Sequence, residues 1–178
     1  MKHLALTLLL LIAVPAGGCV SLSGFFSEEE AGLSSQYDDA GIKTAITSAL
    51  LTSNPTKAND VEVRCFRGHV FLVGEADPEF RRFAAATARE TTGVETVTTH
   101  WFPAATAATA ADTALQAAIA EKLKPLATSA LSQIAVDVWG GQAVLTGILP
   151  DAQKVSQALA AARSTAGVKN VTSYLAAE

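Results

Sequence analysis

Residues 68–76 read GHVFLVGEA, and residues 141–149 read GQAVLTGIL, 73 positions later in a chain of 178 residues. Both stretches follow the pattern G-x-[VA]-x-L-x-G. Apolar residues at every second position are typical of a strand with one packed face. The chain therefore contains the same predicted strand twice. The glycines that align are Gly68 with Gly141 and Gly74 with Gly147.

A second alternating run precedes each of these strands, VEVRC from Val61 and IAVDV from Ile134. The dipeptides Arg67-Gly68 and Gly140-Gly141 connect the runs, and a tight hairpin needs residues there that tolerate positive φ. The sequence therefore predicts two β-hairpins with Gly68 and Gly141 in their turns. The expected inward residues are Val61, Val63, Cys65, Val70 and Leu72, and in the second copy Ile134, Val136, Val138, Ala143 and Leu145.

Helical patterns flank each hairpin. DAGIKTAITSALL starts at Asp39 and DTALQAAIAEKLK at Asp112, again 73 positions apart, and apolar residues recur every fourth position. Both aspartates are expected to be N-caps. A second helix starts near Asp77-Pro78 or Pro150-Asp151 and is followed by a short strand.

These elements predict the α+β class: two tandem αββαβ modules, each a three-stranded mixed sheet with two helices on one face. The helical connection between the second and third strands makes that pair parallel and right-handed. The expected domains are residues 39–102 and 112–176. Between them, residues 103–111 form a linker of small residues.

The N-terminus carries a targeting signal. Lys2 precedes an apolar run from Leu4 to Val14, which is too short to span a bilayer, so residues 1–18 are predicted to be a signal peptide. The sequence AGGC resembles a lipobox, which implies that Cys19 is acylated and anchors the protein to the membrane. An ordinary secreted protein cut near Gly18 is the alternative. Residues 19–38 are expected to be an acidic, flexible tether.

Composition excludes several classes of function. The formal net charge is −4 and no basic cluster is present, so we expect no nucleic-acid partner. The sequence has no Cys/His cluster for a metal and no phosphate loop or nucleophile elbow. We therefore expect no catalytic residue, no metal and no cofactor. Cys65 lies in an alternating run and is expected to be a buried, unreactive thiol.

The duplicated G-x-[VA]-x-L-x-G hairpin, the G-V-x-x-V segments at Gly93 and Gly167, and the lipobox together resemble tandem BON-domain lipoproteins. The plan is similar to OsmY-type periplasmic proteins and closer to dual-BON outer-membrane lipoproteins. The resemblance implies a lipid-anchored protein on the periplasmic side of the outer membrane. Such a protein binds phospholipid and supports outer-membrane integrity or osmotic and envelope stress tolerance. The alternative is a protein-interaction adaptor of an envelope assembly or secretion machine, with membrane contact through the acyl anchor alone.

Two surfaces are candidates for binding lipid or a partner protein. The first is the sheet face opposite the helices, which is more apolar than solvent favours. Either it packs on the other module or the linker, or it holds acyl chains or a protein. Trp139 either anchors at a lipid interface or caps its hairpin. The candidate residues on this face are Phe66, Phe71, Val73 and Trp139.

The second surface is basic and lies on the helices. Lysine and arginine side chains near an anionic leaflet contribute about 1 kcal/mol each to membrane binding. A solvated surface without a ligand is the alternative reading. The candidate residues are Arg81, Arg82, Lys122 and Lys124.

Overall fold

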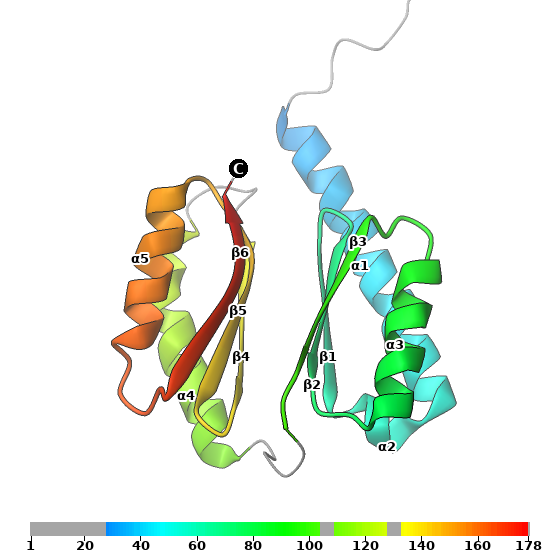
Figure 1. Cartoon of the computed structure of the whole chain (residues 1–178). Coiled ribbons are helices and arrows are strands. Elements are labelled where there is room, and N and C mark those ends of the chain that lie inside the picture. Colours follow the sequence, from blue (N-terminus) through cyan, green and yellow to red (C-terminus); the bar gives the residue numbers. More distant parts are fainter. Residues whose placement is uncertain (1–27, 104–108, 128–132, 178) are drawn as a thin grey trace, which may run out of the picture.

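The structure, a computed structural model, describes residues 28–103, 109–127 and 133–177. Two three-stranded sheets, with strand orders β1-β2-β3 and β4-β5-β6, form the centre of the molecule (Figure 1). Module 1 consists of α1 (Glu28–Ser53), α2 (Pro55–Ala58), β1 (Val61–Phe66), β2 (His69–Gly74), α3 (Pro78–Glu90) and β3 (Thr96–Trp101). Module 2 consists of α4 (Ala110–Leu123), the 3-10 helix η1 (Lys124–Leu126), β4 (Gln133–Trp139), β5 (Gln142–Leu149), α5 (Ala152–Arg163) and β6 (Asn170–Ala177).

The two sheets have the same register, which confirms the α+β class and the duplicated αββαβ plan. In the antiparallel hairpins Val61 pairs with Gly74, and Ile134 pairs with Gly147. The third strand of each sheet runs parallel to the second. Each pairing in module 1 has its counterpart at the matching repeat position of module 2.

The second glycine of each motif is required by the close approach of the first strand. Gly74 has φ +156° and Gly147 has φ +137°. A Cβ atom at either position would lie 2.0 Å from a backbone carbonyl oxygen, that of Asp60 or of Gln133. No side chain fits there, so the hairpin motif ends on glycine in both copies.

Each module packs its own core between its helices and its sheet. In module 1 the helical stripe of Ile42, Ile46 and Leu50 packs on the inward face of β1 and β2, as predicted. Ile119 and Leu123 occupy the same place in module 2. Cys65 is a free, buried thiol, and burial followed by the hydrogen bond to Asp39 raises its pKa to about 12. The expected unreactive thiol is consistent with this environment.

The first helix starts earlier than the sequence indicated. It begins at Glu28 rather than Asp39, so residues 28–38, expected in the flexible tether, are helical, while residues 19–27 lie outside the described residues. No proline interrupts residues 28–53, so one helix can continue through this segment. Asp39 is therefore inside a helix and is not its N-cap. In module 2 the N-cap is Thr109, in a capping box with Asp112.

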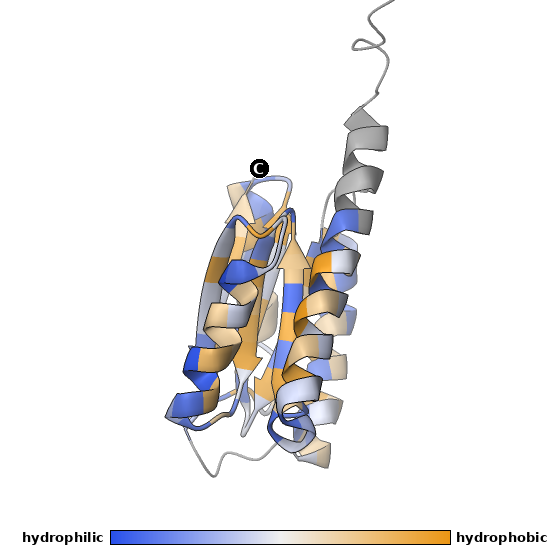
Figure 2. Ribbon diagram, turned by 90° about the vertical axis from the view of Figure 1, so that its right-hand side faces the viewer, coloured by the Kyte–Doolittle hydropathy of each residue, from blue (hydrophilic) through white to orange (hydrophobic). Residues whose placement is uncertain are grey.

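The two sheets face each other, and the helices cover the outside (Figure 1). The two modules have opposite orientations, because their first helices, α1 and α4, run antiparallel to each other in this view (Figure 1). Hydrophobic residues lie along the strands in the rotated view of Figure 2. Within the part of the chain that the structure describes, no helix is both long and apolar enough to cross a membrane.

Candidate functional site

The outward faces of the two sheets form an interface between the modules. Val73 and Phe102 of module 1 and Val144 of module 2 are buried there, each no more than 1% exposed. Phe71, Trp139 and Tyr174 pack around them, half-buried. Apolar area that leaves water contributes roughly 25 cal/mol per Å². Of the two interpretations of this face, packing on the other module is the one that the structure supports.

The apolar candidate residues are therefore covered by the partner module. Phe66 is 7% exposed, and its ring lies 5.9 Å from that of Phe71. The Trp139 ring stacks on Phe102, with 5.1 Å between centroids and 22° between planes. Trp139 thus contacts the end of module 1. An open acyl-chain seat at Phe66, Phe71, Val73 and Trp139 does not agree with this packing.

A buried ion pair crosses the interface. Arg64 donates from Nη2 to Asp137 Oδ1 at 2.6 Å and from Nε to Oδ2 at 3.5 Å. The Asp137 side chain is 1% exposed and that of Arg64 is 23% exposed. Burial lowers the pKa of Arg64, but the hydrogen bond and the charge of Asp137 outweigh it and leave this pKa raised. Removing one partner of such a pair leaves an uncompensated buried charge, which is strongly destabilising.

A second polar contact crosses the interface near its edge. His100 Nδ1 lies 3.1 Å from the Tyr174 hydroxyl. The His100 ring also meets Phe102 and Tyr174 edge-on, at 4.9 Å and 5.9 Å between centroids. Burial lowers the pKa of His100, which favours the neutral ring at neutral pH.

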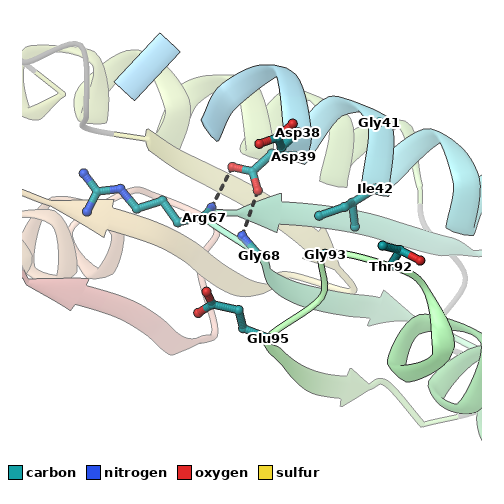
Figure 3. A pocket seen from close by; sticks show the side chains of 9 residues that line it. All are labelled: Asp38, Asp39, Gly41, Ile42, Arg67, Gly68, Thr92, Gly93 and Glu95. Carbon is teal, nitrogen blue, oxygen red and sulfur yellow. Dashed lines mark hydrogen bonds between the residues drawn. The ribbon is translucent and has the colours of Figure 1, made fainter. Parts of the chain in front are cut away.

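Each module carries a carboxylate latch between its first helix and its hairpin turn. Asp39 Oδ1 accepts from the Gly68 N–H at 2.8 Å and Oδ2 accepts from the Arg67 N–H at 2.6 Å (Figure 3). Asp112 Oδ1 accepts from the Gly141 N–H at 2.8 Å. These aspartates were predicted as N-caps, and their tertiary role was missed. Aspartate and glycine are 29 residues apart in both copies, a spacing that follows from the constant repeat offset and does not by itself indicate a contact.

A shallow pocket adjoins each latch, with a volume of about 600 Å³ in module 1 and 580 Å³ in module 2. Figure 3 shows the module 1 pocket, with Asp39 turned toward the hairpin turn and Glu95 on the opposite wall. Lys169 occupies the matching position of Glu95 in module 2. The two pockets therefore lie at equivalent places in the two modules but differ in the charge of this side chain.

The basic candidate residues do not come together in one patch. The Arg81 side chain makes contacts within module 1. Its Nε donates to the Ala76 carbonyl at 2.6 Å, and its guanidinium lies over the Trp101 ring at 5.5 Å. Arg82 is exposed on the same helix. Lys122 and Lys124 are exposed on module 2, where Lys124 pairs with Glu121.

Module 2 has a positively charged surface because two of its acids are buried. Asp112 is held in the latch and Asp137 in the ion pair, at 4% and 1% exposed. Among its described residues, the acids left at the surface are Glu121 and Asp151. The basic residues of module 2 are Lys122, Lys124, Lys154, Arg163 and Lys169.

Reactive groups are sparse in the described residues. Across residues 28–103, 109–127 and 133–177, no group of three or more His, Cys, Asp and Glu side chains could hold a metal ion. Cys19, the predicted lipidation site, lies outside the described residues.

A duplicated αββαβ unit with a glycine-bounded hairpin defines a tandem-module protein of the α+β class. Residues 38–100 and 111–177 each match the BON domain. Because these matches span most of the sequence, the chain belongs to the BON-domain family, as the resemblance indicated.

One curated relative is the 21 kDa hemolysin of Actinobacillus pleuropneumoniae. It is 35% identical over 86 residues, which cover 46% of this chain and 44% of the hemolysin. The chain thus matches less than half the length of this relative.

Two solved structures of CdsD, a structural protein of the type III secretion system of Chlamydia trachomatis, are also similar. One, a C-terminal domain, has 18% identity and a TM-score of 0.32 over 74% of this chain and 63% of its own. The other has 15% identity and a TM-score of 0.33 over 79% and 63%. TM-scores this low do not establish a shared arrangement of the modules.

Proposed function

We propose that this chain is a non-enzymatic, lipid-anchored protein of the outer membrane that faces the periplasm, binds anionic phospholipid and supports envelope integrity. The observation that carries the proposal is the match of both modules to the BON domain, a domain associated with phospholipid binding and with envelope and osmotic-stress proteins. The lipobox-like sequence before Cys19 supports the anchor.

The surface charge favours module 2 as the part that contacts lipid. The sheet faces are covered, so the outer helices and the hairpin ends remain for binding. Lys122 and Arg163 are both exposed, and Lys122 Nζ lies 3.5 Å from the Ser164 carbonyl next to Arg163. Arg163 is the last residue of α5, one of the helices that cover the outside of module 2 (Figure 1). An anionic leaflet attracts such side chains by about 1 kcal/mol each.

Vesicle flotation tests lipid binding without the anchor. The fragment from Val20 to Glu178 contains every described residue and lacks Cys19. We expect it to float with vesicles that contain phosphatidylglycerol, and less so as salt rises, because salt screens exposed charges. No flotation at low salt would contradict phospholipid binding and favour the adaptor function.

A matched pair of variants locates the contact. We expect Lys122→Glu with Arg163→Glu to lose most of the flotation. Arg82→Glu with Arg89→Glu makes the same change in charge on the exposed side of α3 and is expected to keep most of it. Equal losses in both variants would contradict the assignment to module 2.

Metabolic labelling tests the anchor separately. We expect the full chain to incorporate a palmitate analogue in bacterial cells, and the Cys19→Ala chain to lose the label. Label that persists in Cys19→Ala would remove the anchor from the proposal.

A further inference from the structure

The contacts across the module interface join residues with the same place in the repeat. Arg64 and Asp137 are 73 positions apart, which is the repeat offset of the hairpins. His100 and Tyr174 are 74 apart, which is the offset after the second helix, where Gly93 aligns with Gly167. Contacts between equivalent residues are the mark of a two-fold interface, in which the same patch is used on both sides. The pseudo-two-fold axis therefore passes near both pairs.

An axis position has a particular consequence for pairing. If two identical modules met through this face, the residue at position 64 or 137 would meet its own copy. Two arginines or two aspartates would then be buried against each other, and like charges in contact oppose association. Only unlike modules place an arginine opposite an aspartate.

We propose that residues 64 and 137 determine which module each sheet face accepts, and that either face also fits the complementary module of a second copy of this chain. The partner is thus a BON module with the opposite charge at the axis position. This inference concerns pairing between modules and is independent of the proposed lipid binding.

The burial of the pair supports selection by charge. Among the described residues, the Asp137 carboxylate has hydrogen bonds to Arg64 alone, and it is 1% exposed. On the other side, Arg64 Nη2 also lies 3.4 Å from Glu62, which is 46% exposed and solvated. A like-charged residue opposite either side chain would therefore have no buried counter-charge.

The other contacts of the interface stabilise the pairing of modules but do not depend on the charge of the partner. Phe102 stacks on Trp139, and the Phe71 ring lies 6.2 Å from that of Tyr174. These contacts are apolar or aromatic and remain when the axis charges change. A face whose axis residue is mismatched therefore keeps an exposed apolar surface that a matched module can cover.

Two single variants of the Val20–Glu178 chain test the proposal by complementation. Arg64→Asp places aspartate at both axis positions, and Asp137→Arg places arginine at both. Neither chain can match its own modules, but each face of one chain matches a face of the other. Light scattering after gel filtration measures the mass of each variant alone and of an equimolar mixture.

We expect the mixture to form a species of twice the mass of either variant alone, with one copy of each. The wild-type chain and the Arg64→Asp, Asp137→Arg double variant match internally, so a wild-type mixture with either single variant is expected to give no such species. If a single variant aggregates, refolding both together from urea is expected to recover the soluble 1:1 species. Absence of that species after mixing and after co-refolding would overturn the proposal.

Discussion

Arg64 and Asp137 occupy the same position in the two repeats and bind each other across the module interface, with 2.6 Å between Nη2 and Oδ1. The two copies of the repeat thus differ in charge at the position where they contact each other, with arginine in module 1 and aspartate in module 2. The sheet face that sequence reasoning offered as a seat for lipid is therefore used inside the molecule. The surfaces of the chain that stay outside this interface are the outer helices and the loops (Figure 1).

The carboxylate latch gives the first prediction. Asp39→Ala removes the acceptor of two turn N–H groups and of the Cys65 thiol. A buried donor without a partner costs about 1–3 kcal/mol, so we expect a loss of that size in the free energy of unfolding, measured in urea. Asp38→Ala, next to it and exposed, is the control and is expected to stay within about 0.5 kcal/mol of wild type. Equal losses in both variants would contradict the latch.

The same variant changes the reactivity of a thiol. In the Val20–Glu178 chain Cys65 is the one cysteine. Its pKa is raised to about 12 by burial, then by Asp39, so little thiolate forms at pH 8. We expect Cys65 in the Asp39→Ala chain to react faster with a disulfide reagent at pH 8, because the pKa of the Cys65 thiol falls and the hairpin turn opens. An unchanged rate in folded Asp39→Ala would argue against control by Asp39.

Two glycines are expected to respond in opposite directions to alanine. Gly41 lies inside α1, and a Cβ there meets nothing within 4 Å, so Gly41→Ala is expected to stabilise by about 0.5–1 kcal/mol. Gly147→Ala is expected to destabilise by roughly 1–3 kcal/mol through its backbone φ alone, and the overlap with the Gln133 carbonyl adds to this. Thermal unfolding measures both. A stabilising Gly147→Ala would show that β4 and β5 approach less closely than described.

His100 predicts a dependence on pH. Its pKa is lowered in the folded chain by burial, so its contribution to stability is full above the unfolded value of about 6.5. That contribution is lost as the pH falls from 6.5 toward the folded pKa, because the unfolded chain binds the proton more readily. We expect the free energy of unfolding of wild type to fall in this window relative to His100→Phe. Parallel pH profiles of the two chains would contradict the buried, neutral ring.

Much of each module could be predicted from sequence because its signals are local. The glycine pattern and the alternation from Val70 to Leu72 determine the hairpin and its inward face, and the helical stripe through Ile46 identifies the covering helix. Repetition at a constant offset strengthens each weak pattern. The helix start at Asp77-Pro78 is also confirmed, with Asp77 as its N-cap, because the signals for it lie within the start of the helix itself.

The rest depends on contacts distant in sequence. Asp39 has the same local pattern whether it caps a helix or binds a turn 28 and 29 residues away. Thr109 lies in a run of alanine and threonine where no residue stands out as a cap. The pairing of Arg64 with Asp137 requires the orientation of one module on the other, which no local pattern encodes. Arg64 and Asp137 are separated by the repeat offset of 73 residues, but this separation indicates a contact only once the orientation of the modules is known.

The central claim is that the two copies close on each other around an axis at Arg64 and Asp137, and a charge-swap cycle tests it most directly. Urea unfolding at 25 °C compares wild type, Arg64→Asp, Asp137→Arg and the double swap. We predict that each single variant loses about 3–5 kcal/mol, because it buries a charge without its partner, and that the double swap regains at least half of the summed loss. A double swap whose loss equals the sum of the two single losses would show that the residues do not interact and would contradict the account.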